Sequence, residues 1–238
     1  KSEFYRLACT FYVSPGNERT YVVLSGLNEN MPAAVQLFEK LLADAQVNKE
    51  AYTNMTSDIL KARSDAKLNQ GQNFSRLMSF AMYGPKSPAT NLLTEAELTN
   101  MNPQELVDRI HNQNSYKHRI LYYGPSSSKD LLATINQYHQ VPAALKDIPA
   151  GNEYSYLETP VTKVLVAPYD AKQIYMAQIS NLDKKYDPAI EPIRALYDEY
   201  FGGGMNSIVF QEMRETRGLA YSAWASIMPP SYLKYPYV

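Results

Sequence analysis

The stretch that decides the expected fold reads Phe201-Gly-Gly-Gly-Met-Asn-Ser-Ile-Val-Phe-Gln-Glu-Met-Arg-Glu-Thr-Arg-Gly-Leu-Ala-Tyr-Ser-Ala-Trp224. Its three consecutive glycines are typical of a helix end followed by a tight reversal of the chain. Residues Ser207 to about Glu215 then predict a short helix, which Gly218 ends. The run 219–227 mixes small, aromatic and β-branched residues and predicts a strand. The whole segment is therefore expected to run helix, glycine turn, helix, strand.

The residues before this stretch continue the mixture of strands and helices. Asp187-Pro188 predicts a helix start, because aspartate caps helices and proline suits the first turn. Two earlier runs, 162–167 and 173–180, predict strands. The buried face of the helix that begins at Asp187 is expected to contain Ile190, Ile193, Leu196, Tyr197 and Tyr200.

The earlier part of the chain contains a second set of elements. The aromatic and β-branched runs 4–13 and 20–24 predict an antiparallel pair of strands, joined by a turn at 14–17. Apolar residues at helical spacing follow, and a capping box of the form Thr94-x-x-Glu97 marks one helix start. Helices are expected from Asn30, from Asn48, over 74–83, from Thr94, from Asn102 and from 126–128, with a short strand at 120–123.

A linker separates the two sets of elements. Pro142, Pro149 and Gly151 fall within 141–151, and no hydrophobic period crosses that stretch. The predicted domains are 1–145, the later part of one α+β domain, and 146–238, the first part of the next. Neither end has a cap or a tail, so we expect both to be boundaries within a longer protein. The element order predicts an α+β fold of two-layer units, with helices packed on one face of a mainly antiparallel sheet.

The composition excludes some classes of function. The chain has 238 residues, of which 45% are hydrophobic and 20% charged, and its net charge is −1. These values suit a packed globular protein. Acidic and basic residues are interspersed, so no basic face for nucleic acid is expected. The apolar runs are far shorter than a membrane span, so no membrane partner is expected either.

No catalytic residue and no metal ligand is predicted in this chain. His111, His118 and His139 stand at neither H-x-x-H nor H-x-x-E-H spacing, and each is interpreted as a surface or capping residue. Residues 202–207 lack the lysine of a phosphate-binding loop, and no G-x-S-x-G motif occurs. Cys9 is the single cysteine, so it cannot form an internal disulfide and is interpreted as a small buried hydrophobe.

Segment 201–224 resembles the signature of the second domain in each half of the pitrilysin and insulin-degrading-enzyme family of zinc metallopeptidases, the inverzincins. That signature is a helix, a glycine turn, a short helix ending in R-E-x-R-G-L-A-Y, and a strand. The run Ile120-Leu-Tyr-Tyr-Gly-Pro125 likewise resembles the strand that closes the preceding domain. The resemblance implies metallohydrolase-like, processing-peptidase-like α+β units, and outside 201–224 it is diffuse.

The resemblance implies that Arg214 and Tyr221 bind substrate. In this family an arginine and a tyrosine at this spacing, from the half without zinc, reach the bound peptide. A guanidinium offers forked donors to backbone carbonyls, and a phenol can stabilise a developing oxyanion. The alternative reading of the same residues is an ion-paired arginine at a helix end and a half-buried strand tyrosine. Arg217 is expected in a structural ion pair. The resemblance also implies a strand edge onto which the peptide adds, without indicating which strand.

The chain departs from a catalytic half at the helix that would carry a glutamate ligand of zinc. This helix reads Tyr52-Thr-Asn-Met-Thr-Ser-Asp58-Ile-Leu-Lys61, and Asp58 is its nearest acid. Aspartate is one methylene shorter than glutamate and would misplace a ligand that must sit about 2 Å from zinc. We therefore expect a half that never held zinc, with no cofactor of its own and with zinc in its partner half.

The function that the resemblance implies is the substrate-binding, non-catalytic portion of a zinc-dependent endopeptidase that encloses and cleaves peptides or unfolded polypeptides. Its partners would be the peptide substrate and the zinc-bearing N-terminal half of the same protein or a partner subunit. Alone, the chain is expected to be inactive. One alternative is a non-enzymatic scaffold or processing-partner subunit of the same fold, and another is an unrelated α+β binding module. The composition is rich in tyrosine and asparagine, which weakly favours an exported or periplasmic bacterial protein. No physical argument supports this preference.

Overall fold

The chain forms two compact units, each assembled from two stretches of sequence. The computed structural model describes residues 2–16, 19–182 and 184–229. The first unit comprises Lys1–Lys61 and Leu93–Asn152, and the second comprises Ala62–Leu92 and Glu153–Val238. The expected domain boundary between residues 145 and 146 therefore falls inside the first unit, close to its end. The division of the sequence into domains 1–145 and 146–238 stays a prediction.

The first unit begins with a short helix and a β-hairpin. Helix α1 spans Ser2–Arg6, and strands β1 (Cys9–Pro15) and β2 (Thr20–Gly26) pair antiparallel, with Cys9 opposite Gly26 and Pro15 opposite Thr20. The predicted strand over 4–13 is thus wrong in its first half. Phe4 and Leu7 are three residues apart, which places both on one side of a helix, and the chain reverses at Ala8 with a φ of 49°.

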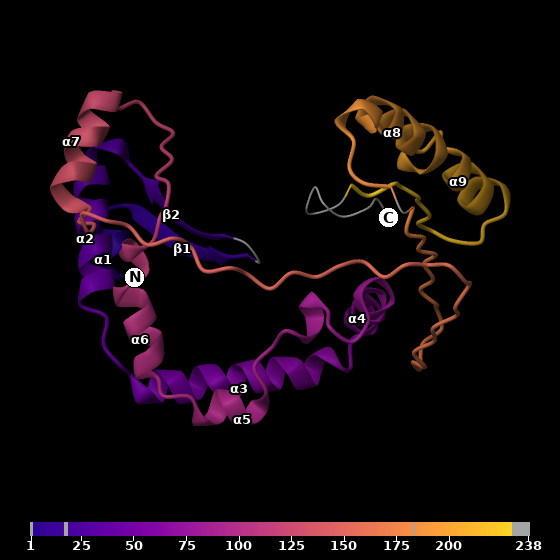
Figure 1. The fold of residues 1–238 in the computed structure, drawn as a ribbon, viewed down its shortest axis with the longest axis horizontal. Helices are drawn as coiled ribbons and strands as arrows, with labels where there is room; N and C mark the ends of the chain where they lie inside the picture. Colours follow the sequence, from indigo (N-terminus) through magenta and orange to yellow (C-terminus); the bar gives the residue numbers. More distant parts are fainter. Residues whose placement is uncertain (1, 17–18, 183, 230–238) are drawn as a thin grey trace. The chain divides into compact units, whose positions relative to one another are not determined.

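Helices cover this hairpin and extend the first unit. Helices α1 and α2 contact the hairpin, and α7 packs beside α2 (Figure 1). Asn30 precedes α2, and a proline stands in its first turn, as the sequence predicts. The helices of this unit after α1 are α2 (Met31–Ala43), the start of α3 (Lys49–Ala66), α5 (Glu95–Asn100), α6 (Gln104–His111) and α7 (Ser128–Tyr138), with short 3-10 turns at Asn28–Asn30 (η1) and Gln113–Ser115 (η3).

The core of the first unit lies between α1, the hairpin and α2. Phe4, Cys9 and Ala34 are buried, and Phe4 packs 4.7 Å from Phe11 between ring centroids. Around them pack the partly buried side chains of Leu7, Phe11, Leu24, Leu37 and Phe38. Cys9 is a buried free thiol, which confirms its interpretation as a small core residue.

The predicted capping box at the start of α5 is confirmed. The Thr94 hydroxyl accepts from the Glu97 backbone N–H, and the Glu97 carboxylate accepts from the Thr94 backbone N–H. That backbone hydrogen bond, together with one from the Thr94 hydroxyl, lowers the pKa of Glu97. The short strand expected at 120–123, in contrast, is not assigned as a strand.

The second unit is built around helix α4 (Gln70–Tyr83), which Asn69 caps. The chain that returns from Glu153 lies along it: the Leu157 N–H bonds the Met82 carbonyl, and the Tyr175 ring meets Phe74 edge-on at 5.6 Å. Farther along are η2 (Pro88–Thr90), η4 (Pro188–Ile190), α8 (Glu191–Asp198), the π-helical η5 (Glu199–Gly203), α9 (Ile208–Phe210) and the π-helical η6 (Gln211–Thr216).

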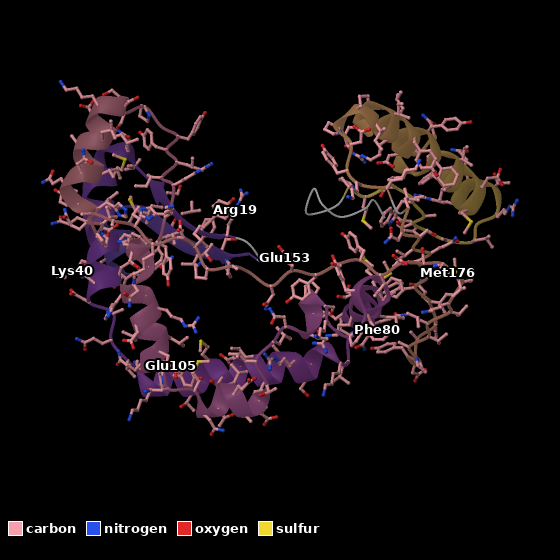
Figure 2. All side chains as sticks on the ribbon, in the orientation of Figure 1. Arg19, Lys40, Phe80, Glu105, Glu153 and Met176 are labelled. Carbon is pink, nitrogen blue, oxygen red and sulfur yellow. The ribbon has the colours of Figure 1, made fainter. Side chains whose placement is uncertain are left out.

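Three predicted strands of the second unit are not formed. Runs 162–167, 173–180 and 219–227 are irregular or extended, because no neighbouring strand pairs with them in the part of the chain that the structure describes. Their apolar side chains remain exposed; Met176, for example, is 79% exposed on its stretch (Figure 2). The face of α8 that was expected to be buried is exposed as well, since Leu196 is 73% accessible without a sheet to cover it.

The described residues therefore form an α+β structure that is mostly helical, with one two-stranded antiparallel sheet. No helix within the described ranges is both long enough and apolar enough to cross a lipid bilayer.

Candidate functional site

Arg214 and Tyr221, the two residues expected to bind substrate, lie against each other. The guanidinium carbon of Arg214 is 4.7 Å from the centre of the Tyr221 ring and 4.8 Å from the centre of the Phe210 ring. Both distances are within the range of a cation–π interaction. The arginine therefore contacts two aromatic rings, and its Nε lies 3.5 Å from a carboxylate oxygen of Glu215.

A left-handed glycine brings Tyr221 back to Arg214. Arg214 belongs to the last turn of η6, and Gly218 follows with a φ of 59°, a conformation that glycine adopts at little cost. The Gly218 N–H bonds the Arg214 carbonyl, and the Leu219 N–H bonds the Met213 carbonyl. These two bonds close the helix and reverse the chain, so that a residue three positions beyond the glycine can stack on the last helical turn.

The segment after Tyr221 is fixed to the preceding helix by its backbone. Gly202, at the end of η5, approaches Ala225 so closely that an added Cβ would lie 2.2 Å from the Ala225 oxygen and 2.3 Å from its nitrogen. A few residues on, Asp198 accepts the Ile227 N–H at 2.8 Å, and Arg194 donates to the Ile227 carbonyl at 3.0 Å. We call Arg194, Asp198 and Ile227 the clamp.

The clamp predicts a measurable loss of stability for Asp198→Asn. Besides Ile227, Asp198 accepts from the Arg194 guanidinium at 2.6 Å, so an asparagine amide would turn one acceptor into a donor that faces the arginine. We expect the free energy of unfolding to fall by about 2 kcal/mol, as for other hydrogen bonds to charged groups. Chemical denaturation followed through Trp224, the only tryptophan, measures this change. Asp58→Asn on the exposed side of α3 is the control and should change nothing; an equal effect of both variants would contradict the assignment.

The stacked pair keeps its polar groups available. Tyr221 is 84% exposed, and no described residue forms a hydrogen bond with its hydroxyl. The Arg214 side chain is 37% exposed, and a guanidinium carries five N–H donors. The arrangement can therefore present forked N–H donors and a phenol O–H to a carbonyl or carboxylate group.

Arg217 has a different environment, which matches its expected role. Its guanidinium forms an ion pair with Glu212 at 3.2 Å and is 63% exposed. The five-residue separation of this pair fits the wide turns of η6, which is π-helical. Arg217 thus forms an exposed ion pair, while Arg214 contacts two aromatic rings.

The residues present do not fit a zinc ion. No group of three or more histidine, cysteine, aspartate or glutamate side chains in the described ranges is arranged to hold a metal. Asp58 is exposed on α3, without any neighbouring ligand group.

Sequence reasoning missed two constellations. One is the clamp, whose arginine and aspartate stand four residues apart on α8, a spacing that could have indicated their ion pair. The other joins His118, His139 and Glu39, which the chain brings together over separations of 21 and 100 residues. No local motif could have indicated it.

Comparisons with known proteins support the fold rather than a particular protein. The elements define an α+β fold, and a solved chain shares it: the crystal structure of a peptidase M16 inactive domain from Pseudomonas fluorescens superposes with a TM-score of 0.51 and 15% sequence identity, over 99% of this chain. The present chain spans 57% of the length of that one. No family model and no curated protein matches this sequence. At this identity the similarity is one of fold.

Proposed function

We propose that this chain is the substrate-binding, non-catalytic portion of a zinc-dependent endopeptidase that encloses and cleaves peptides or unfolded polypeptides. The observation that carries the proposal is the stack of Arg214 on Tyr221. It occurs in the segment that resembles the pitrilysin signature, within a fold similar to a peptidase M16 inactive domain.

The proposed roles follow from the geometry of the pair. Arg214 would donate to carbonyl groups of a bound peptide, and because two rings contact its guanidinium, less side-chain entropy is lost on binding. The Tyr221 hydroxyl would donate to the carbonyl oxygen at the bond being cut, where negative charge develops. Zinc and the hydrolytic water would belong to the partner half, in the same chain or in another subunit.

A second candidate function is a scaffold or processing-partner subunit of the same fold. It is favoured by the apolar side chains that remain exposed in the second unit, because such surface usually contacts another protein. Examples are Val164, Val166, Ile174, Met176 and Leu196. A scaffold would use this surface and would have no need for the stacked pair.

Reconstitution distinguishes the two candidates. The chain is mixed with the zinc-bearing half of its parent protein, and cleavage of a quenched fluorescent peptide is followed. We expect neither part to cut alone and the mixture to cut, because binding groups and zinc come from different halves. If the zinc-bearing half is equally active by itself, the chain is a scaffold and the roles of Arg214 and Tyr221 are withdrawn.

A further inference from the structure

Two histidines from distant parts of the first unit face each other. The Nε2 atoms of His118 and His139 are 2.8 Å apart, and their ring planes are nearly perpendicular, at 89°. His139 follows the last residue of α7, and His118 lies in the irregular stretch after η3. The contact therefore joins two segments that no strand pairing connects.

The second nitrogen of each ring, Nδ1, donates a hydrogen bond to a neighbouring oxygen. His118 Nδ1 lies 2.6 Å from the Tyr116 carbonyl oxygen, which can only accept. His139 Nδ1 lies 2.7 Å from Oε1 of Glu39, whose Oε2 accepts from the Asn114 amide at 2.8 Å. A carboxylate that accepts on both oxygens is the form that fits these contacts. Both Nδ1 atoms thus carry a hydrogen.

The proton count then decides the state of the pair. A contact of 2.8 Å between two Nε2 atoms needs one hydrogen between them, since two lone pairs or two N–H groups would repel. With both Nδ1 atoms protonated, the two imidazoles hold three ring protons and one positive charge, which Glu39 balances. We propose that His118 and His139 share one proton and, with Glu39, form a latch. The latch ties residues 116–118 and the end of α7 to α2.

The same distances argue against a metal ion between the rings. The ring centroids are 5.0 Å apart, while the Nε2 atoms are 2.8 Å apart. The difference between these two distances is close to twice the distance from the centre of an imidazole ring to its Nε2 atom. The two Nε2 atoms therefore point straight at each other, along the line that joins the ring centres. Two ligands of one metal would instead point at a common third position, and their nitrogens would be farther apart.

The latch has a defined environment. The side chains of His139 and Glu39 are 14% and 16% exposed, whereas His118 is exposed and can exchange its proton with water. Glu39, from α2, is the one charged side chain in the described ranges that is hydrogen-bonded to the pair. Asn114 from η3 is neutral. On the stretch of His118, Lys117 is paired with Asp147, and Lys146 lies over the Tyr116 ring.

The first test measures the ring protons of the unchanged chain. Nitrogen-15 spectra of the imidazole groups at about pH 6.5 should show three ring protons on the pair, with each Nδ1 protonated and the Nε2 signals coupled to one shared hydrogen. His111, whose Nε2 contacts only the Ala45 carbonyl, gives the reference for an unpaired ring. Two independent neutral rings would overturn the proposal.

The second test is a double-mutant cycle of His118→Gln and His139→Gln, with unfolding measured by chemical denaturation. We expect a favourable coupling between the two positions, and Glu39→Gln should weaken it. His111→Gln as the second partner should show no coupling. If His118 and His139 are not coupled, the proposal is wrong. It is also wrong if the coupling appears only when zinc ions are added and vanishes with a chelator, because the site would then hold a metal.

Discussion

Gly202→Ala is expected to lower the free energy of unfolding of the second unit by about 3 kcal/mol, near the upper end of the usual cost of overpacking. The new Cβ would lie 2.2 to 2.7 Å from the oxygen, nitrogen and carbonyl carbon of Ala225. These are backbone atoms, so no change of rotamer can relieve the clash, and η5 or the segment around Ala225 must move. Denaturation followed by Trp224 fluorescence measures the loss one residue away from the contact.

A glycine two positions away provides the matched control. A Cβ on Gly204 would meet only the Glu199 carboxylate, at 3.2 Å, and its φ of −149° suits any residue. Gly204→Ala should therefore change stability by less than about 0.5 kcal/mol. Shortening Ala225 to glycine should not rescue Gly202→Ala, because the clash is with the backbone. If Gly202→Ala leaves both the unfolding curve and the Trp224 spectrum unchanged, the close approach of these two segments is wrong.

If the proposed function holds, Tyr221→Phe in the assembled peptidase is expected to reduce kcat about 100-fold, at the lower end of the effect of removing one oxyanion donor. The substitution removes only a hydroxyl that no described residue contacts, and the ring stays available to stack on Arg214. Stability should therefore be unaltered. A fall in kcat with little change in KM would indicate an interaction made mainly in the transition state.

Arg214→Ala should lower kcat and raise KM, because the guanidinium is proposed to bind the peptide as well as to position it. Arg214→Lys keeps the charge but loses the planar fork and most of the stacking between Phe210 and Tyr221, so it should recover little activity. Arg217→Ala is the matched control, since that residue pairs with Glu212 at an exposed site. If Tyr221→Phe and Arg214→Ala are as active as Arg217→Ala, the stacked pair has no role in turnover.

The sequence predicted the helices and the hairpin well, because each depends on neighbours along the chain. Asn30 and Thr94 mark helix starts where the structure has them, and the Ser207 hydroxyl caps α9 by accepting from the Phe210 N–H. The helix expected over 74–83 begins earlier, at Gln70. The hairpin is likewise local, with a turn between two strands of matching pattern.

The predictions that failed depend on partners that a pattern does not specify. Runs 162–167, 173–180 and 219–227 have the residues of strands, yet a strand also needs a neighbour for its N–H and C=O groups. In the described ranges the last of these runs uses a side-chain carboxylate and a guanidinium at Ile227 instead. For the candidate site, the spacing of Arg214 and Tyr221 was visible, whereas the stacking between them depends on Gly218 and on Phe210.

The π-helical turns of η6 leave room for the loss of one residue. A π-helix contains an additional residue for each turn compared with an α-helix, so removing one residue from 211–216 would let the segment rewind as an α-helix. Because an α-helix turns by about 100° per residue and a π-helix by less, the shortened segment would span nearly the same rotation as before. The side chains after the deletion would therefore keep nearly their direction relative to Phe210. A one-residue deletion in this segment is a shortening of the helix rather than a change of direction.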